Sequence, residues 1–262
     1  MTRPPLSPAD LRAQCRTGAW TAPTAGQAPG YVQANLVVLP AEDAFDFLLF
    51  CQRNPKPCPL LEVCEPGDPV PRRIAPQADL RTDLPLYRVY RSGNLVETVA
   101  DIRHLWRDDF VSFLIGCSFT FDHVLIRAGI PVRHVELNCN VPMYRTNIPC
   151  TPAGRFSGRL VVSMRPLRPG EAIRAVELTA PLPQVHGSPV HIGFPEQIGI
   201  DDLNRPDWGD PVPVKEGELP VFWACGVTPQ AVALEAKVPL MITHSPGCMF
   251  VSDLREHELL TQ

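Results

Sequence analysis

The sequence predicts a mixed α/β fold with some α+β character, in which layered sheets carry flanking helices and are joined by proline-rich, irregular connections. Strand-like apolar runs and helix-like segments alternate over the second half of the chain, which favours α/β layering with some parallel strands. The 262 residues, 45% of them hydrophobic, supply enough apolar side chains for a sizeable core. The 31 prolines lie between apolar runs, so they indicate rigid turns and helix starts rather than disorder.

Capping residues and periodicity define the elements that we expect in the first hundred residues. Ser7 followed by Pro8 is typical of a helix start, and Gly18 of a helix end. Alternating patterns on both sides of Ser92-Gly93-Asn94 are typical of a hairpin. In chain order we expect a helix over 7–18, a strand over 31–40, a helix over 41–54, a functional loop or wrapping segment over 55–85, and a hairpin over 86–99.

The rest of the chain alternates between short apolar runs and helical segments. Gly116-Cys117-Ser118 interrupts one long apolar stretch, and we expect a short helix on each side of this break. In chain order the expected elements are these two helices within 107–130, a strand over 134–138, a proline-bounded loop over 140–150, a strand over 158–166, a helix over 169–182, strands over 188–194 and 221–225, a helix over 228–237, and a strand over 239–245.

Charge and cysteine content narrow the class of partner. The net charge of −4 gives no indication of nucleic acid or an anionic membrane as a partner. The longest apolar runs are far shorter than a membrane span, and the N-terminal segment lacks the apolar region of a signal peptide. The nine cysteines form no CxxC pair, so we expect reduced thiols in a cytoplasmic protein. The sequence leaves a homo-oligomer open.

Two apolar runs end in polar residues at positions that we expect to be strand tips. The first run ends at Cys225-Gly226, where glycine permits close approach of a ligand and Thr228 can cap the next helix or donate its hydroxyl. The second ends at Thr243-His244, where a histidine could serve as a general base. A plain helix cap and a histidine bonded to a loop are the alternatives. Two such tips, one helix apart, favour a shared crevice for a small anion.

Two further groups are candidates for the same crevice. Cys117 and Ser118 lie at the expected helix break, where the helix dipole would lower the pKa of the thiol, and Asp122 follows on the next helix. Tyr144 and Arg145 lie in the proline-bounded loop, where an arginine can bind a carboxylate through two hydrogen bonds. A buried structural cysteine and an ordinary surface loop are the alternatives.

Segment 186–210 combines enough histidines and carboxylates to suggest a divalent metal. The residues concerned are His186, His191, Asp201, Asp202, Asp207 and Asp210. Their spacing matches no standard metal motif, so acidic turn residues are the alternative. No other cofactor is indicated, because the sequence contains no Walker A loop, no GxSxG, no HExxH and no GxGxxG after a strand.

Ten ordered sequence blocks between about Ser7 and Leu254 resemble the hydro-lyase family that includes the catalytic domain of mitochondrial D-glutamate cyclase. They include "QANLVVLP", "ADLRTDLPLYRVYR", "FLIGCSF", "NVPMYRTNI", "HGSPVHIG", "PDWGD", "FWACGVTPQ" and "THSPGCMFV". The resemblance implies a single unit over residues 1–262 with two intertwined α/β parts. One part would combine about 1–110 with 165–225, and the other about 111–164 with 226–262. Phe194 stands where the family pattern has aspartate, and Asp122 where it has glutamate.

The resemblance implies loss of water from a small amino or carboxylic acid, with conversion of D-glutamate to 5-oxo-D-proline as the first expectation. Dehydration of a different amino or hydroxy acid, or plain binding of a small carboxylate, are the alternatives. Ring closure needs a neutral amine, a neutralised carboxylate and an acid for the leaving oxygen. The implied catalytic residues are His244, His191, Cys117, Asp122, Asp207 and Cys225, and the implied substrate-binding residues are Arg145, Tyr144, Ser118, Thr228, Gly226 and Thr243.

Overall fold

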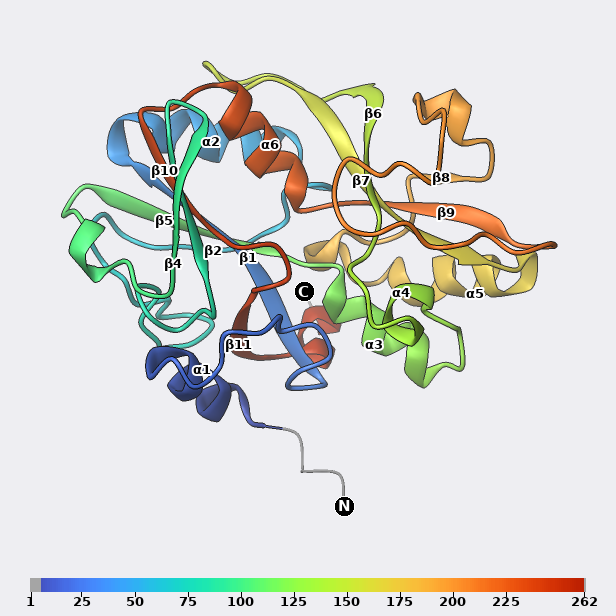
Figure 1. The fold of residues 1–262 in the computed structure, drawn as a ribbon, viewed down its shortest axis with the longest axis horizontal. Helices are drawn as coiled ribbons and strands as arrows, with labels where there is room; N and C mark the ends of the chain where they lie inside the picture. The colour runs from blue at the N-terminus through green and yellow to red at the C-terminus, as the bar shows by residue number, and fades with distance from the viewer. Residues whose placement is uncertain (1–5, 262) are drawn as a thin grey trace.

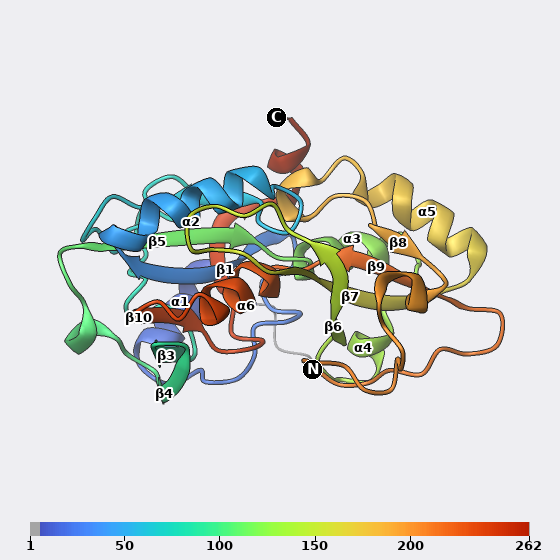
Figure 2. The ribbon, with the colours of Figure 1, turned by 90° about the horizontal axis from the view of Figure 1, so that it is seen from above.

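The structure, a computed structural model that describes residues 6–261, confirms the mixed α/β and α+β fold class (Figure 1). Two sheets lie side by side and helices flank both of them (Figures 1 and 2). Every strand pairing in the described residues is antiparallel, so the expectation of parallel strands is wrong. Alternation along a chain predicts the order of strands and helices. It does not determine which strands become neighbours in a sheet, and therefore it does not determine whether they pair parallel or antiparallel.

The helices begin and end close to their capping residues. At the first of them, Ser7 Oγ accepts a hydrogen bond from the Asp10 N–H at 3.2 Å, and Pro8 occupies the first turn, as expected. The α-helices are α1 (Pro8–Arg16), α2 (Ala41–Arg53), α3 (Phe119–Arg127), α4 (Arg133–Glu136), α5 (Pro169–Thr179) and α6 (Val227–Glu235). The short 3-10 helices are η1 (Arg103–Leu105), η2 (Pro183–Val185), η3 (Pro195–Ile198) and η4 (Glu256–Thr261).

The strands form one seven-stranded and one four-stranded sheet. The larger sheet has the order β2-β5-β1-β10-β3-β4, and β11 also pairs with β1. Its strands are β1 (Tyr31–Pro40), β2 (Leu60–Val63), β3 (Tyr87–Arg91), β4 (Asn94–Val99), β5 (Phe110–Gly116), β10 (Leu240–His244) and β11 (Phe250–Arg255). The smaller sheet has the order β6-β7-β9-β8, with β6 (Met143–Pro149), β7 (Arg159–Leu167), β8 (His191–Ile192) and β9 (Leu219–Ala224).

Three local expectations are wrong. Residues 110–116 form strand β5 and not a helix, because the strand is buried on both faces and carries no alternation to distinguish it from a buried helix. Residues 133–136 form the short helix α4 where we expected a strand. Residues 143–149 form strand β6 where we expected a loop, since its polar side chains point out of a half-buried sheet edge. Strands β2 and β11 were not anticipated.

Strand β1 forms the centre of the molecule because both of its faces are buried. Leu36 belongs to a core that includes Phe121 of α3, whereas Val37 belongs to a second core that includes Phe47 of α2 and Val232 of α6. Helix α3 follows a strand of the larger sheet and packs against α5, and α6 follows a strand of the smaller sheet and lies beside α2 (Figure 1). The chain therefore crosses between the sheets twice, and its division into two intertwined parts stays a prediction.

Two general features bear on the class of protein. No helix within residues 6–261 has both the length and the apolar character that a membrane crossing requires. All nine cysteines are free thiols, and eight of them are buried.

Candidate active site

Strand β5 meets helix α3 at a junction that backbone hydrogen bonds hold in place. The Cys117 N–H donates to the Gln33 carbonyl oxygen at 3.1 Å. The Gln33 N–H in turn donates to Thr120 Oγ1 at 3.1 Å. Thr120 therefore occupies the place where strand β1 would otherwise continue its pairing with β5, and the start of α3 is fixed against β1.

Strand β9 meets helix α6 through the same pattern of bonds. The Cys225 N–H donates to the Val161 carbonyl oxygen at 3.0 Å, and the Val161 N–H donates to Thr228 Oγ1 at 3.0 Å. The two junctions thus share a Cys-x-x-Thr pattern, which no repeat in the sequence had suggested. In both cases the cysteine directly follows a buried strand, and the residue after it is the N-cap of a helix, where the first N–H groups have no partner within the helix.

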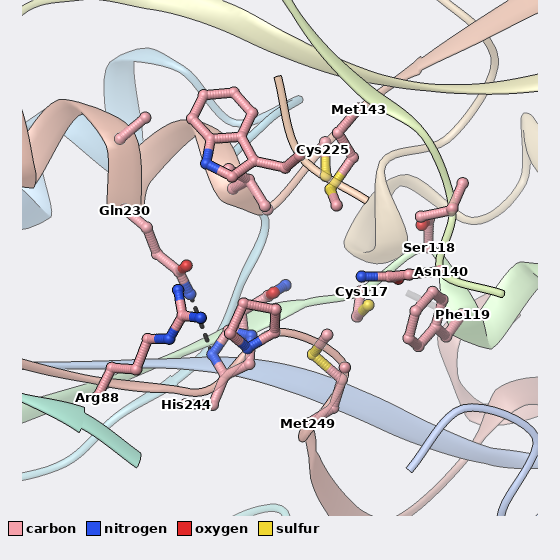
Figure 3. A pocket seen from close by; sticks show the side chains of 18 of the residues that line it. Arg88, Cys117, Ser118, Phe119, Asn140, Met143, Cys225, Gln230, His244 and Met249 are labelled. Atoms are coloured by element: carbon pink, nitrogen blue, oxygen red, sulfur yellow. Dashed lines mark hydrogen bonds between the residues drawn. The ribbon is translucent and has the colours of Figure 1, made fainter. Parts of the chain in front are cut away.

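The two junctions open onto one cavity between the sheets, with a volume of about 70 Å³ (Figure 3). A single water molecule needs roughly 10–15 Å³ on this measure, so the cavity has room for a small organic molecule. Its polar side carries Asn35, Arg88, Gln230 and His244. Its opposite side is mostly apolar and rich in sulfur, with Cys117, Phe119, Met143, Trp208, Cys225 and Met249, and Ser118 and Asn140 add polar groups there (Figure 3).

Arg88 supplies positive charge to the cavity. It lies on β3, where Tyr87 and Val89 point into the core and Arg88 points to the opposite face. Among residues 6–261 no carboxylate pairs with it, and its buried Nε has no hydrogen-bond partner. A buried polar group without a partner costs about 1–3 kcal/mol, which a bound anion would recover. Arg88 is therefore the strongest candidate for binding a carboxylate.

His244 adjoins Arg88 and Gln230 in the cavity (Figure 3). Its Nδ1 lies 3.1 Å from the Leu36 backbone nitrogen, 3.4 Å from the Leu36 carbonyl oxygen and 3.0 Å from the side-chain nitrogen of Gln230. The backbone N–H can only donate and makes the shorter of the two Leu36 contacts, which favours the neutral tautomer with its proton on Nε2. Burial lowers the pKa of His244 to about 4, and the Arg88 charge lowers it further, against a hydrogen bond to Leu36 that raises it. His244 is thus a neutral hydrogen-bond donor at pH 7 and a weak base.

The two cavity thiols are protonated at neutral pH. Burial raises the pKa of Cys117 to about 12 and that of Cys225 to about 11. The backbone N–H groups of Phe119 and Val227 act in the opposite direction but do not overcome burial. The expectation that a helix start lowers the pKa of Cys117 is therefore wrong, because removal from water outweighs the dipole here.

Ser118 lines the cavity, whereas Asp122 lies behind its wall. Both oxygens of Asp122 accept hydrogen bonds from Arg165, at 2.8 and 2.9 Å, and the ring of His134 lies 3.3 Å away. Burial raises the pKa of Asp122, but the charge of Arg165 and the nearby His134 hold it well below its usual range. Arg165 also donates to Ser118 Oγ at 3.1 Å. Asp122 thus orients the arginine that supports Ser118 and does not itself face the cavity.

Arg145, Tyr144 and Asp207 lie in a separate, open depression on the surface. Arg145 pairs with Glu235 at 3.0 Å, and its backbone N–H donates to Asp207 Oδ2 at 2.8 Å. The Tyr144 hydroxyl donates to the Leu203 carbonyl oxygen at 2.7 Å. These groups are occupied with one another and with the 201–210 segment, and they do not share the cavity with His244.

The remaining predicted residues also lie outside the cavity lining. His191 on β8 has its Nε2 3.0 Å from the Phe194 carbonyl oxygen. The Thr228 hydroxyl is bonded to Val161 on β7, and Thr243 Oγ1 donates to the His244 carbonyl oxygen at 2.9 Å. The structure thus brings together Cys117, Ser118, Cys225, Gly226 and His244, and it places the other predicted residues elsewhere.

The histidines and carboxylates of segment 186–210 do not converge. His186 is buried with its Nδ1 2.9 Å from the Lys56 carbonyl oxygen, and Asp210 accepts a hydrogen bond from the Asn140 N–H at 2.8 Å. In the part of the chain that the structure describes, no group of three or more His, Cys, Asp and Glu side chains is arranged to bind a metal ion. The acidic residues of this segment instead accept hydrogen bonds from backbone N–H groups, within turns or on neighbouring segments.

Sequence reasoning missed Asn35, Arg88 and Gln230. Period-2 alternation in 87–91 does place Arg88 opposite the core residues, but such a face normally points to solvent. Only the packing of β10 and α6 beside β3 turns that face into a cavity wall. Asn35 gave a usable signal, because it is a polar residue within an otherwise apolar run that is buried on both faces.

Comparison with known proteins identifies the family. The D-glutamate cyclase family profile matches residues 111–253, from β5 to β11. The protein named "Putative hydro-lyase" in Rubrobacter xylanophilus is 63% identical and covers 95% of this chain and 96% of its own. Proteins of that name in Geobacillus kaustophilus and Bacillus subtilis are 62% and 58% identical, each over 97% of this chain and over 97% and 99% of their own.

Among solved structures, a nitrogen repressor-like protein from Methanococcus jannaschii aligns with a TM-score of 0.38 and 11% identity, over 90% of this chain and 91% of that one. That similarity is too low to carry information about function. The family profile and the full-length relatives agree with each other and with the sequence blocks described above. The chain belongs to the D-glutamate cyclase family.

Proposed function

We propose that this protein is a hydro-lyase that closes D-glutamate to 5-oxo-D-proline with loss of water in the cavity between the starts of α3 and α6. One observation carries the proposal: the described lining holds an unpaired cation, Arg88, and no carboxylate. A carboxylate would pair with the substrate's ammonium group and keep it protonated. A cavity that is positive and shielded from water instead favours the neutral amine, which is the form that can attack a carboxyl carbon.

The proposed reaction balances without any co-reactant. The amine nitrogen attacks the γ-carboxyl carbon, the new C–N bond closes the ring, and one C–O bond breaks. The ammonium group loses two protons on the way to a lactam, and the leaving oxygen gains two protons to become water. The residues need only bind the acid, stabilise the oxyanion and permit these proton transfers.

Each cavity group has a role in this scheme. Arg88 binds one substrate carboxylate as a charge-assisted pair. The N–H groups of Ser118 and Gly226, at the two helix starts, bind the other carboxyl group. His244 donates its Nε2 proton to a carboxyl oxygen as a neutral imidazole, since its pKa of about 4 makes it a poor base at neutral pH.

Dehydration of a small hydroxy acid is a second candidate, favoured by the same lining. A substrate without an amine needs no acidic partner, and the cavity offers none within the described residues. The apolar, sulfur-rich side would then contact the carbon chain of the substrate.

The test is turnover of D-glutamate, L-glutamate and D-2-hydroxyglutarate, followed by NMR. We expect 5-oxoproline from D-glutamate only. Arg88→Met should lower kcat/KM by about 100-fold, because two charge-assisted hydrogen bonds are lost. Arg91→Met is the matched control, since Arg91 is exposed on the same strand and lies outside the cavity lining. Full activity of Arg88→Met would rule out this active site, and water loss from the hydroxy acid alone would favour the second candidate.

A further inference from the structure

We propose that the side-chain oxygen of Asn35 accepts a hydrogen bond from the substrate's amine and thereby selects the amine in its neutral form. The inference rests on the proposed function, because it concerns the same cavity. It goes further because it assigns recognition of the substrate's amine to Asn35, a residue that is not needed to bind the two carboxylates.

The orientation of the Asn35 amide follows from its hydrogen bonds. Asn35 lies on β1, lines the cavity, and is 3% exposed. Its Nδ2 donates to the carbonyl oxygens of Ile115 at 3.3 Å and Gly116 at 3.1 Å. Carbonyl oxygens only accept, so the nitrogen must face β5 and the assignment of nitrogen and oxygen is fixed. Within residues 6–261, no group donates a hydrogen bond to the Asn35 Oδ1 that remains.

The Asn35 amide packs closely against Gly226 at the start of α6. A Cβ atom at position 226 would lie 2.1 Å from Asn35 Nδ2 and 3.1 Å from Oδ1. Any larger residue would displace the amide, so glycine is needed here for close approach. Asn35 and Gly226 both line the cavity, so the Asn35 amide adjoins the place where the substrate would bind.

Asparagine suits a neutral amine better than aspartate would. An amide oxygen accepts one N–H bond from an amine without adding negative charge. A carboxylate in the same place would stabilise an ammonium group and raise its pKa, which would remove the nucleophile. With Arg88 as the charged group of the described lining, a bound amine is driven towards its neutral form. One proton must then leave for the solvent when the substrate binds, and one is taken up again when the leaving oxygen becomes water, so the overall reaction stays balanced.

Calorimetry in buffers of different ionisation enthalpy measures this proton release. At pH 7 we expect release that approaches one proton per D-glutamate bound, and close to none with glutarate, which has both carboxylates and no amine. Binding of D-glutamate without proton release would overturn the proposal, and so would failure of D-glutamate to bind.

Two variants assign the effect to Asn35. Asn35→Ala should weaken D-glutamate binding about 10-fold and leave glutarate binding unchanged. Asn35→Asp should abolish the proton release and raise the affinity for D-glutamate relative to glutarate by at least about 10-fold. Equal losses for both ligands in Asn35→Ala would assign Asn35 a purely structural role and end the proposal.

Asn54→Asp is the matched control, because Asn54 is another buried asparagine whose Nδ2 donates to two carbonyl oxygens, at Phe50 and Thr151, outside the cavity. It should change neither the proton release nor the ligand preference. The measurements also separate the two proposals. Binding with proton release but no lactam product refutes the cyclase activity and supports amine selection. Lactam formation without proton release on binding supports the cyclase activity and refutes amine selection.

Discussion

Acidification should destabilise this protein between pH 6.5 and 4, because two buried histidines are held neutral. Burial is the main cause in both cases, and it lowers the pKa of His186 and of His244 to about 4 each. A hydrogen bond to a backbone group opposes the shift at each ring, whereas nearby positive charge adds to it. The folded state therefore resists protonation that the unfolded chain accepts readily.

The sign and the magnitude follow from linkage. A histidine in the unfolded chain has a pKa of about 6.5, so the unfolded state binds more protons between pH 6.5 and 4. The stabilisation is complete above pH 6.5 and is lost as the pH falls towards 4. A shift of roughly 2.5 units at about 1.4 kcal/mol per unit gives about 3 kcal/mol for each histidine. The two together amount to about 6 kcal/mol, which is comparable with the whole stability of many domains, about 5–15 kcal/mol.

Urea unfolding followed by tryptophan fluorescence at a series of pH values between 7.5 and 4.5 measures this loss. We expect the free energy of unfolding to fall steadily below pH 6.5. His186→Asn should remove about half of the pH dependence, and asparagine suits the position because residue 186 has a φ of 80°. A stability that stays flat from pH 7 to 4.5 would refute the reasoning, since both histidines would then ionise in the folded state.

Three other predictions address the junctions and the segment 186–210. Gly226→Ala should lower the free energy of unfolding by about 1–3 kcal/mol and weaken D-glutamate binding, because the new Cβ would meet the Asn35 side chain. Thermal unfolding measures the first effect and calorimetry the second, and no change in either would contradict the close approach of Gly226 to Asn35. Cys117→Ser and Cys225→Ser should each keep turnover within a few-fold of the unchanged protein, since thiols with pKa values of about 12 and 11 are not nucleophiles at pH 7. Complete loss of activity in a folded variant would show that the thiol takes part in the reaction. EDTA should leave turnover unchanged, because the acidic residues of 186–210 do not converge on a common point, and loss of activity that Mg²⁺ or Mn²⁺ restores would be evidence to the contrary.

The sequence predicted the parts of this fold that local physics determines. Ser7 and Pro8 start α1, and Pro40 stands at the end of β1, because caps and proline act on their own neighbours. The sequence does not distinguish strand β5 from a buried helix, because a strand buried on both faces shows no period. The antiparallel pairing was missed because pairing depends on how distant segments meet.

The candidate site shows the same division between local and distant effects. The tips with Cys225 and His244 are predicted from the end of an apolar run followed by a turn, whereas Cys117 is predicted at a break between two helices and lies instead after strand β5. The sequence indicates Arg145 because it lies in a polar cluster, and it gives no signal for Arg88, yet the structure pairs Arg145 with Glu235 and leaves Arg88 without a carboxylate partner in the described residues. Which arginine keeps an unpaired charge depends on residues that are distant in the chain, so a single sequence read segment by segment does not distinguish the two.

The two ends of the cavity differ chemically because different residues follow the two cysteines: Ser118 follows Cys117, and Gly226 follows Cys225. The two junctions share their backbone bonds, but Ser118 faces Arg165 and Gly226 faces Asn35. Ser118 Oγ accepts from a guanidinium that cannot accept in return, so its own proton is free to bond a ligand. One end therefore presents donors and the other presents the Asn35 oxygen as an acceptor. A substrate that carries a carboxyl group and an amine can satisfy both groups in one orientation only, and the carboxylate contact proposed for Arg88 adds the third contact that is needed to distinguish D- from L-glutamate.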